Sequence, residues 1–408
     1  MTKDQHRRGP TTRWPVRTAC AVLLVVVVGP LAGQEPPTRF GDPLPGILPA
    51  EFERFRLGLD DFLEVETAED GLGPSFNASS CAVCHNVPAV GGVSLVSEVR
   101  AAYREADGRI RPLTGPDGRP LDTLFHLFST PPHACQPKVP AEANVFARRV
   151  PIPAFGAGLV EAIPDETLLA LADPDDRNGD GIRGRAAIVI DRATGDRRVG
   201  RFGWKAQHAT LRAFSGDAYR NEMGITNELF PDELVPGVSP EQLRLCDPTP
   251  DPEDRPDPRT HLTALDNFEA FLRFLAPPPR GTIDDAARAG ELVFSTVGCA
   301  QCHVAVLQTG SSRNPLFDRR PVRAYSDFLL HDIATGDSIP QASALPNELR
   351  TPALWGLRVR RPLLHDGSAS TPEEAIRRHG GEARDARGRF ERLTDTERAR
   401  LIAFLNSL

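Results

Sequence analysis

Cys81-Ala-Val-Cys84-His85 and Cys299-Ala-Gln-Cys302-His303 are two copies of the pattern Cys-x-x-Cys-His, and they decide how the rest of the chain is interpreted. The pattern is typical of c-type haem attachment, because the two thiols form thioether bonds to the vinyl groups and the adjacent histidine binds the iron. A zinc site would need further Cys or His ligands nearby, and a thioredoxin-like motif would not need the histidine twice. The sequence therefore predicts two covalently bound haem c groups.

The first 33 residues have the order of an export signal. Basic residues precede an apolar run over 19–28, and small residues over 29–33 offer a cleavage site. We expect residues 1–33 to be a signal peptide and the mature protein to be periplasmic, with an uncleaved signal segment as the one expected contact with a membrane. Loss of five basic residues and one acidic residue would change the net charge from −7 to −11, which argues against a nucleic-acid partner.

Two cysteines of the expected mature chain, Cys135 and Cys246, lie outside the haem motifs. In an oxidising compartment such a pair favours a disulfide, and two unpaired thiols are the alternative.

The chain also contains an internal duplication. Gly58-x-x-x-Phe62 precedes the first motif and Gly290-x-x-x-Phe294 precedes the second. Thr282 and Asp285 form a capping-box pattern at the start of the second helix. The two halves thus begin alike, with a helix that runs into the haem motif.

Each half also ends with an apolar helix pattern. One lies over 265–275 and stops at Pro277-Pro278-Pro279-Arg280-Gly281, and the other runs from Thr394 to Leu408. A cytochrome c domain packs its first and last helices against each other beside the haem. We therefore expect a mainly α fold with two cytochrome c-like haem domains, 34–276 and 282–408, joined by a linker over 277–281. The first domain would carry long loop insertions over 104–140 and 173–200.

His379 is the best candidate for a second ligand at the C-terminal haem. Thr371 is a predicted N-cap with Pro372 at the first helical position, and Gly380 follows the histidine. The alternative is a solvent-exposed histidine at a helix C-terminus.

Several stretches resemble a known family. They include Arg350 to Gly356, Leu364 to Ser368, Phe76 to Cys81, Arg201 to Gln207 and Asn221 to Thr226. They are similar to the di-haem oxidoreductase family, sometimes labelled thiol oxidoreductase, which is related to the bacterial di-haem cytochrome c peroxidases. In that group the position matching His379 carries the axial Met or Tyr of the electron-transfer haem. The resemblance thus implies a bis-His centre of His303 and His379.

The other side of the first haem is open to several readings. His85 is the proximal ligand, and Met223, one of four histidines (His126, His133, His208 and His261), or no protein ligand lies opposite. Peroxide cleavage needs an acid–base group over the iron. Glu161, after an apolar stretch, is the first candidate and Glu222 the second. Trp204 is the candidate for the aromatic residue that the related peroxidases hold between their haems; ordinary core packing is the alternative for it.

Asp176, Asn178 and Asp180 alternate as in the first half of an EF-hand loop, although the closing Glu is missing. We expect either a calcium site completed from elsewhere or a plain turn.

Together these features predict a periplasmic di-haem peroxidase-like oxidoreductase. Electrons from a small redox protein would enter at the C-terminal haem, and peroxide or a related oxidant would be reduced at the N-terminal haem. The first alternative is a non-catalytic electron-transfer protein, and the second is an enzyme that oxidises a protein side chain or a small thiol.

Overall fold

The computed structural model describes Met1 and residues 38–115, 118, 120–247 and 255–408. The predicted signal peptide lies outside these residues except for Met1. Residues 37–408 form one compact unit. Among the described residues, no helix has the length and apolar character needed to cross a membrane.

The helices of the described residues are short. They are α1 (Pro49–Leu63), α2 (Cys81–Cys84), α3 (Ala157–Glu161), α4 (Asp165–Leu171), α5 (Leu211–Ala218), η1 (Tyr219–Met223), α6 (Pro240–Cys246), α7 (Ala264–Phe274), α8 (Asp285–Val297), η2 (Cys299–Gln301), α9 (Pro372–Arg378), η3 (Gly381–Ala383), α10 (Arg384–Glu391) and α11 (Asp395–Leu405).

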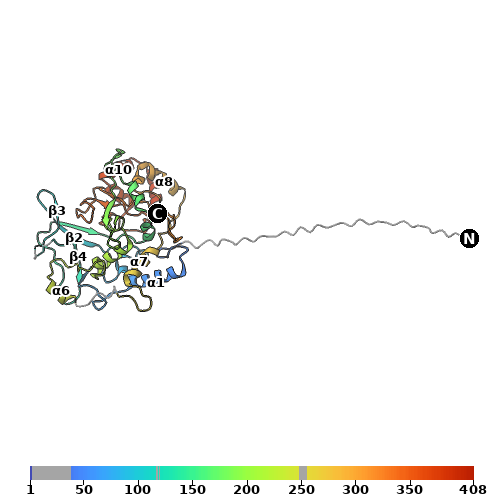
Figure 1. Cartoon of the computed structure of the whole chain (residues 1–408). Coiled ribbons are helices and arrows are strands. Elements are labelled where there is room, and N and C mark those ends of the chain that lie inside the picture. The colour runs from blue at the N-terminus through green and yellow to red at the C-terminus, as the bar shows by residue number, and fades with distance from the viewer. Residues whose placement is uncertain (2–37, 116–117, 119, 248–254) are drawn as a thin grey trace. The chain divides into compact units, whose positions relative to one another are not determined.

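Two helix pairs account for the repeated Gly-x-x-x-Phe pattern. Helix α1 packs on α7 and helix α8 packs on α11. A Cβ atom on Gly58 would lie 1.9 Å from the carbonyl oxygen of Asn267, and one on Gly290 would lie 1.9 Å from that of Arg400. Glycine is therefore required at both crossings, because any side chain would push the helices apart. Figure 1 shows α1 beside α7 at one end of the compact unit and α8 near α10 at the other.

Most of the predicted helix ends are confirmed. Thr371 and Thr394 accept hydrogen bonds as the N-caps of α9 and α11, and Glu397 completes the second capping box. The predicted N-cap of α8 was wrong, because Asp284, and not Thr282, accepts a hydrogen bond from Ala287 N.

The prediction of a mainly α fold needs correction, because the structure is mixed, with 30% helix and 14% strand. Twelve strands occur among the described residues, several of them in the two stretches expected to be loops. They are β1 (Ser75–Phe76), β2 (Glu98–Arg104), β3 (Ile110–Arg111), β4 (Leu124–Phe125), β5 (Phe128–Ser129), β6 (Val145–Arg149), β7 (Ala187–Ile190), β8 (Arg197–Gly200), β9 (Leu307–Gln308), β10 (Pro321–Val322), β11 (Leu330–His331) and β12 (Leu349–Arg350).

The largest sheet is antiparallel and has the order β3-β2-β4, with β6 also paired to β2. Side chains of β6 alternate between buried and exposed, as expected of a sheet with one covered face. Its partner β2 lies more than forty residues earlier, with Glu98 opposite Arg149. The residues of β6 form a strand because they pair with this distant segment of the chain.

Two apolar cores accompany the helix pairs. Phe62, Phe268 and Phe271 lie in the first core, where the rings of Phe62 and Phe271 are 4.7 Å apart. Phe294 and Phe404 lie in the second, with their rings 5.1 Å apart. The division into domains 34–276 and 282–408 stays a prediction.

Cys135 and Cys246 form the predicted disulfide, with a Cα–Cα distance of 6.0 Å. It joins the end of α6 to the loop that follows β5.

Candidate functional site

Each Cys-x-x-Cys-His motif lines one large cavity. Cys81, Cys84 and His85 lie in a cavity of about 200 Å³, which we call the first cavity. The second cavity, of about 470 Å³, is lined by Cys299, Cys302 and His303 together with other residues. Helix α2 brings the first two thiols to the same wall, because Ser80 caps it by accepting a hydrogen bond from Ala82 N.

The histidines of these cavities share one hydrogen-bond arrangement. Nδ1 of His85 donates to the carbonyl of Gly92 at 2.9 Å, and Nδ1 of His303 donates to that of Tyr325 at 3.0 Å. His379, the predicted second ligand, donates from Nδ1 to Ala375 O at 2.8 Å. Each ring therefore keeps Nε2 as its free, unprotonated nitrogen, the atom that a metal ion binds.

His379 lines the second cavity together with His303. Burial, together with the nearby His379, lowers the pKa of His303 to about 4. Burial also lowers the pKa of His379. The structure does not show the solvent-exposed histidine of the alternative, because the ring of His379 is only partly exposed and lines the cavity with His303.

Hydrogen bonds to residues 331–333 hold the loop that follows His379. Glu382 accepts a hydrogen bond from Nδ1 of His331 at 2.7 Å and from the backbone of Asp332 at 2.9 Å. Gly380 N donates to Ile333 O at 2.8 Å. The cluster of Cys302, Asp327 and His331 resembles a metal site in composition, but His331 is engaged by both carboxylates and Cys302 belongs to the haem motif.

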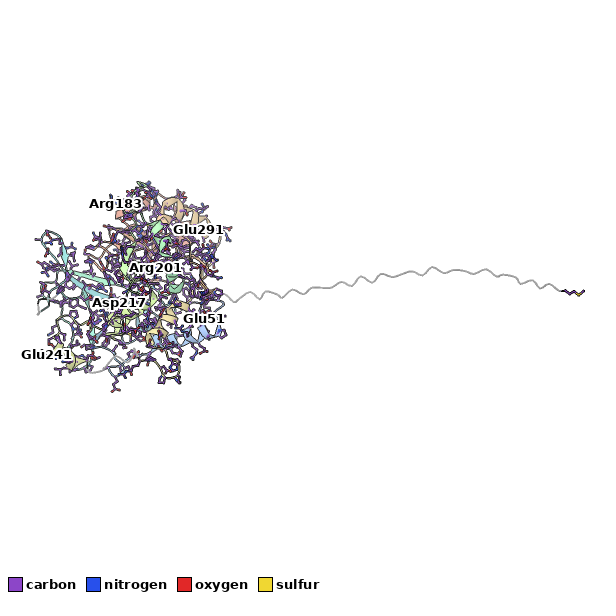
Figure 2. The ribbon with its side chains drawn as sticks, viewed as in Figure 1. Glu51, Arg183, Arg201, Asp217, Glu241 and Glu291 are labelled. Atoms are coloured by element: carbon purple, nitrogen blue, oxygen red, sulfur yellow. A yellow bond between two sulfur atoms is a disulfide. The ribbon has the colours of Figure 1, made fainter. Side chains whose placement is uncertain are left out.

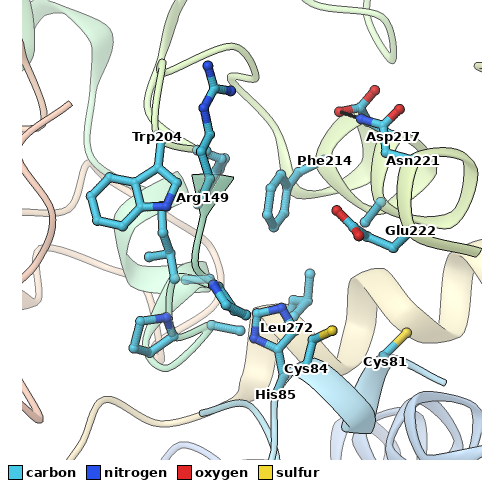
Figure 3. Close-up of a pocket in the computed structure, with 18 of the residues that line it drawn as sticks. Cys81, Cys84, His85, Arg149, Trp204, Phe214, Asp217, Asn221, Glu222 and Leu272 are labelled. Carbon is cyan, nitrogen blue, oxygen red and sulfur yellow. Dashed lines mark hydrogen bonds between the residues drawn. The ribbon is translucent and has the colours of Figure 1, made fainter. Parts of the chain in front are cut away.

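Glu222 points into the first cavity. Figure 3 shows its carboxylate above the Cys84–His85 segment, near Phe214. Asn77 Nδ2 donates to its Oε2 at 3.0 Å. The pKa of Glu222 is raised to about 7, first because burial disfavours the carboxylate and second because Glu98 lies close enough to repel it. Glu222 thus has a pKa suited to accepting and returning a proton near neutral pH.

Glu161, the first candidate for this role, lies elsewhere. It does not line the first cavity. One carboxylate oxygen pairs with Arg273 at 2.7 Å, and the other accepts a hydrogen bond from Leu211 N at 2.7 Å. Helix α3 turns this side chain toward α5 and α7, because Gly158 packs directly on the backbone of Arg273. Its contacts join three helices, and the structure does not bring it to the first cavity, where the prediction placed an acid–base group.

Met223 lines the first cavity at its cysteine side. Its sulfur lies 3.9 Å from Sγ of Cys81. A thioether at Cys81 would attach to the periphery of a haem, so this position places Met223 beside the rim and favours a packing role. The other four candidate histidines do not line the cavity, and His85 is the one histidine among its lining residues. His126, for example, is engaged by Ser75 and by Asn221 O.

Trp204 lines both cavities. It is buried, and its Nε1 donates to Val150 O at 2.8 Å. Figure 3 shows it on the side of the first cavity opposite Glu222. The hydrogen bond fixes the indole in the wall that the cavities share.

Gln207 was not identified as a functional residue from the sequence. It lines the first cavity, and its Oε1 is buried without a hydrogen-bond partner among the described residues. It lies in the stretch Arg201 to Gln207 that carries the family resemblance. Arg201 itself, labelled near the middle of the folded unit in Figure 2, is buried and paired with Asp165.

In the EF-hand-like loop, side-chain oxygens accept hydrogen bonds from the loop itself. Asp176 Oδ1 accepts from Gly181 N, and Asp180 Oδ1 accepts from Ile182 N. Asp180 Oδ2 accepts from Asn178 Nδ2 and from Gln301, next to Cys302. The loop's oxygens serve its own turn, so the prediction of calcium gains no support here and stays a prediction.

The cavities fit the group that their motifs predict. Two thiols, a histidine with free Nε2 and mainly apolar walls line each of them. Such a set suits a haem, which needs apolar contact with its faces and an imidazole at its iron.

Comparisons with known proteins agree with this chemistry. The profile of the family described as "Di-haem oxidoreductase, putative peroxidase" matches residues 136–408. Methylamine utilization protein MauG of Methylorubrum extorquens is 31% identical over 207 residues, which are 46% of this chain and 54% of that protein. The chain thus spans about half the length of this curated relative.

Solved structures are similar at a lower level. The diheme peroxidase BthA of Burkholderia thailandensis has a TM-score of 0.40 at 17% identity, over 87% of this chain and 86% of that one. Hydrazine synthase of Kuenenia stuttgartiensis has a TM-score of 0.41 at 16% identity, over 94% and 99%. No functional conclusion follows from similarity at this level. The family match covers well over half of the sequence, and the chain therefore belongs to the di-haem oxidoreductase family.

Proposed function

We propose that this chain is a periplasmic di-haem c-type oxidoreductase that reduces peroxide or a related small oxidant in the first cavity. Electrons would enter at the second cavity from a small periplasmic redox protein. The asymmetry of the cavities carries the proposal. Four histidines line the second cavity, among them His303 and His379, whereas the first combines a single lining histidine, His85, with a carboxyl group of raised pKa, that of Glu222.

In this proposal the cysteine pairs hold the haems covalently, Cys81 with Cys84 and Cys299 with Cys302. A bound haem supplies an iron that changes its oxidation state. In the second cavity His303 and His379 would hold the haem iron, and an iron held by two histidines suits electron transfer. In the first cavity His85 would hold the iron, and a small molecule would have access to it, since His85 is the one histidine that lines this cavity.

The residues over the first cavity move the proton that peroxide cleavage requires. Glu222 takes the proton from one peroxide oxygen and gives it to the other, which leaves as water. Asn77 holds its Oε2 in place. Gln207 offers an amide that can orient the oxidant. Trp204, in the shared wall, lies on the path between the cavities.

Electron paramagnetic resonance of the oxidised, haem-loaded protein tests the proposal. We expect one high-spin and one low-spin signal, unchanged in Met223→Leu, which preserves the apolar volume. Two low-spin signals, one of which becomes high-spin in Met223→Leu, would instead identify Met223 as a ligand and the protein as an electron relay.

If two low-spin signals persist in Met223→Leu, the spectrum of the half-reduced protein shows whether the first site opens on reduction. Stopped-flow mixing with hydrogen peroxide then gives the reactivity directly. In a peroxidase, hydrogen peroxide oxidises the haems rapidly after mixing, whereas in a protein that only transfers electrons the reaction is slow.

A further inference from the structure

Two buried arginines lie at the wall between the cavities. Arg350, on β12, lines both cavities, whereas Arg360 lines the second alone. Their exposed fractions are 4% and 6%. The guanidinium of Arg360 lies over the ring of Trp204, 5.6 Å from its centroid. The two cations therefore flank the tryptophan that both cavities share.

Neither arginine forms an ion pair within the described part of the chain. Arg350 donates to Gly203 O at 2.8 Å and to Thr351 O at 3.1 Å. Nε of Arg360 has no hydrogen-bond partner among the described residues, and neither has Nδ1 of the nearby His365. Arg360 thus lines the second cavity with a buried N–H donor that no described residue satisfies.

The pKa values of both arginines lie below the ordinary value of an arginine side chain. Burial, together with the positive charge of Arg360, lowers the pKa of Arg350 to about 9, although Asp327 acts in the opposite direction. Burial lowers the pKa of Arg360 to about 10. The carboxylate of Asp327 accepts its hydrogen bonds from His331 and Leu329 and forms no ion pair with Arg350.

The other buried arginines and lysines among the described residues have partners. Arg201 pairs with Asp165, and Lys205 pairs with Asp337 at 3.1 Å. Arg100 pairs with Glu98 at 2.9 Å. A buried charge without a counter-charge is strongly unfavourable, so the two exceptions indicate that an anion completes this wall.

We propose that Arg350 and Arg360 form a carboxylate-binding site for the haem propionates, with Arg350 serving the haems of both cavities and Arg360 serving the second alone. The inference rests on the proposed function, since it requires a haem in each cavity. Arg350 then acts on both irons, because a nearby positive charge favours the reduced, less positive state of each.

Spectroelectrochemical titration of the haem-loaded protein tests this division. Arg350→Gln should lower both midpoint potentials, and Arg360→Gln should lower that of the second haem alone. We expect about a tenfold change in the ratio of reduced to oxidised haem, or about 59 mV for a one-electron couple. Arg350→Lys and Arg360→Lys keep the charge and should retain most of the potential.

Arg358→Gln is the matched control, since it removes the same charge two residues from Arg360 and lines neither cavity. Shifts in Arg350→Gln and Arg360→Gln no larger than in this control would overturn the inference. If Arg350→Gln does not load haem, Arg360→Gln tests the inference by itself. A lower midpoint potential of the second haem alone would support the site, and unchanged potentials would refute it.

Two further measurements separate the sources of failure. Excess acetate should leave the wild-type potentials unchanged; a shift that Arg360→Gln abolishes would show that the arginines hold a free carboxylate, against the propionate assignment. Haem content is measured first. Fewer than two haems per wild-type chain refutes the proposed function, whereas two haems without the variant shifts refute this inference alone.

Discussion

Replacing Glu222 by Gln should make the protein more stable at high pH and much slower with peroxide. The folded-state pKa of about 7 lies above the ordinary value of 4.5. The stability that protonated Glu222 contributes is therefore complete below pH 4.5 and is lost as the pH rises through about 7. At about 1.36 kcal/mol for each pH unit, the full difference is at most about 3 kcal/mol.

The kinetic expectation has the opposite sign. In the wild-type protein the rate constant with hydrogen peroxide should rise with pH through a midpoint of about 7, because only the carboxylate accepts a proton. Glutamine has the same shape but cannot accept it, so the rate constant should fall about 10²–10⁴-fold and lose this pH dependence. Stopped-flow absorbance between about pH 5 and about pH 9, a range centred on the pKa of Glu222, measures both effects.

Glu161→Gln is the matched control, since Glu161 is also a buried carboxylate but lines neither cavity. It should lose stability through its contact with Arg273 and keep the peroxide rate. A wild-type rate and pH profile in Glu222→Gln, together with a large loss in Glu161→Gln, would refute the assignment. Urea denaturation at about pH 5 and at about pH 9, roughly two units on either side of neutrality, gives the stability difference.

Three further outcomes are expected. His379→Ala should convert one low-spin electron paramagnetic resonance signal to high-spin, and an unchanged spectrum would remove it as a ligand. Gly290→Ala should lower the free energy of unfolding by about 1–3 kcal/mol in urea denaturation, because its Cβ would lie 1.9 Å from a backbone oxygen. Gly388→Ala is the control and should cost little, because the nearest atom to its Cβ would be 3.6 Å away. Equal urea midpoints for the two variants would contradict the close packing of α8 on α11. Joint replacement of Cys135 and Cys246 by Ala should cost about 2–5 kcal/mol without changing the peroxide rate, and a large kinetic loss would show that the disulfide supports the cavity.

The local patterns of the sequence predicted what depends on neighbours in the chain. The spacing of Cys81, Cys84 and His85 specifies haem attachment without reference to the rest of the fold. The cap at Thr394 and the apolar stripe over 265–275 appear in the structure as expected, because helix ends and helix faces are set by residues three or four apart.

Tertiary structure decided what depends on distant segments. Strand β6 becomes a strand because β2 pairs with it, and the choice of Glu222 over Glu161 depends on which way α3 faces when it packs on α7. Glu161 follows an apolar stretch and Glu222 does not, so the local sequence ranked Glu161 first. The unpaired charges of Arg350 and Arg360 are equally invisible in the sequence. Whether a charged side chain is buried, and whether a carboxylate lies within ion-pair distance of it, depends on how distant segments pack together.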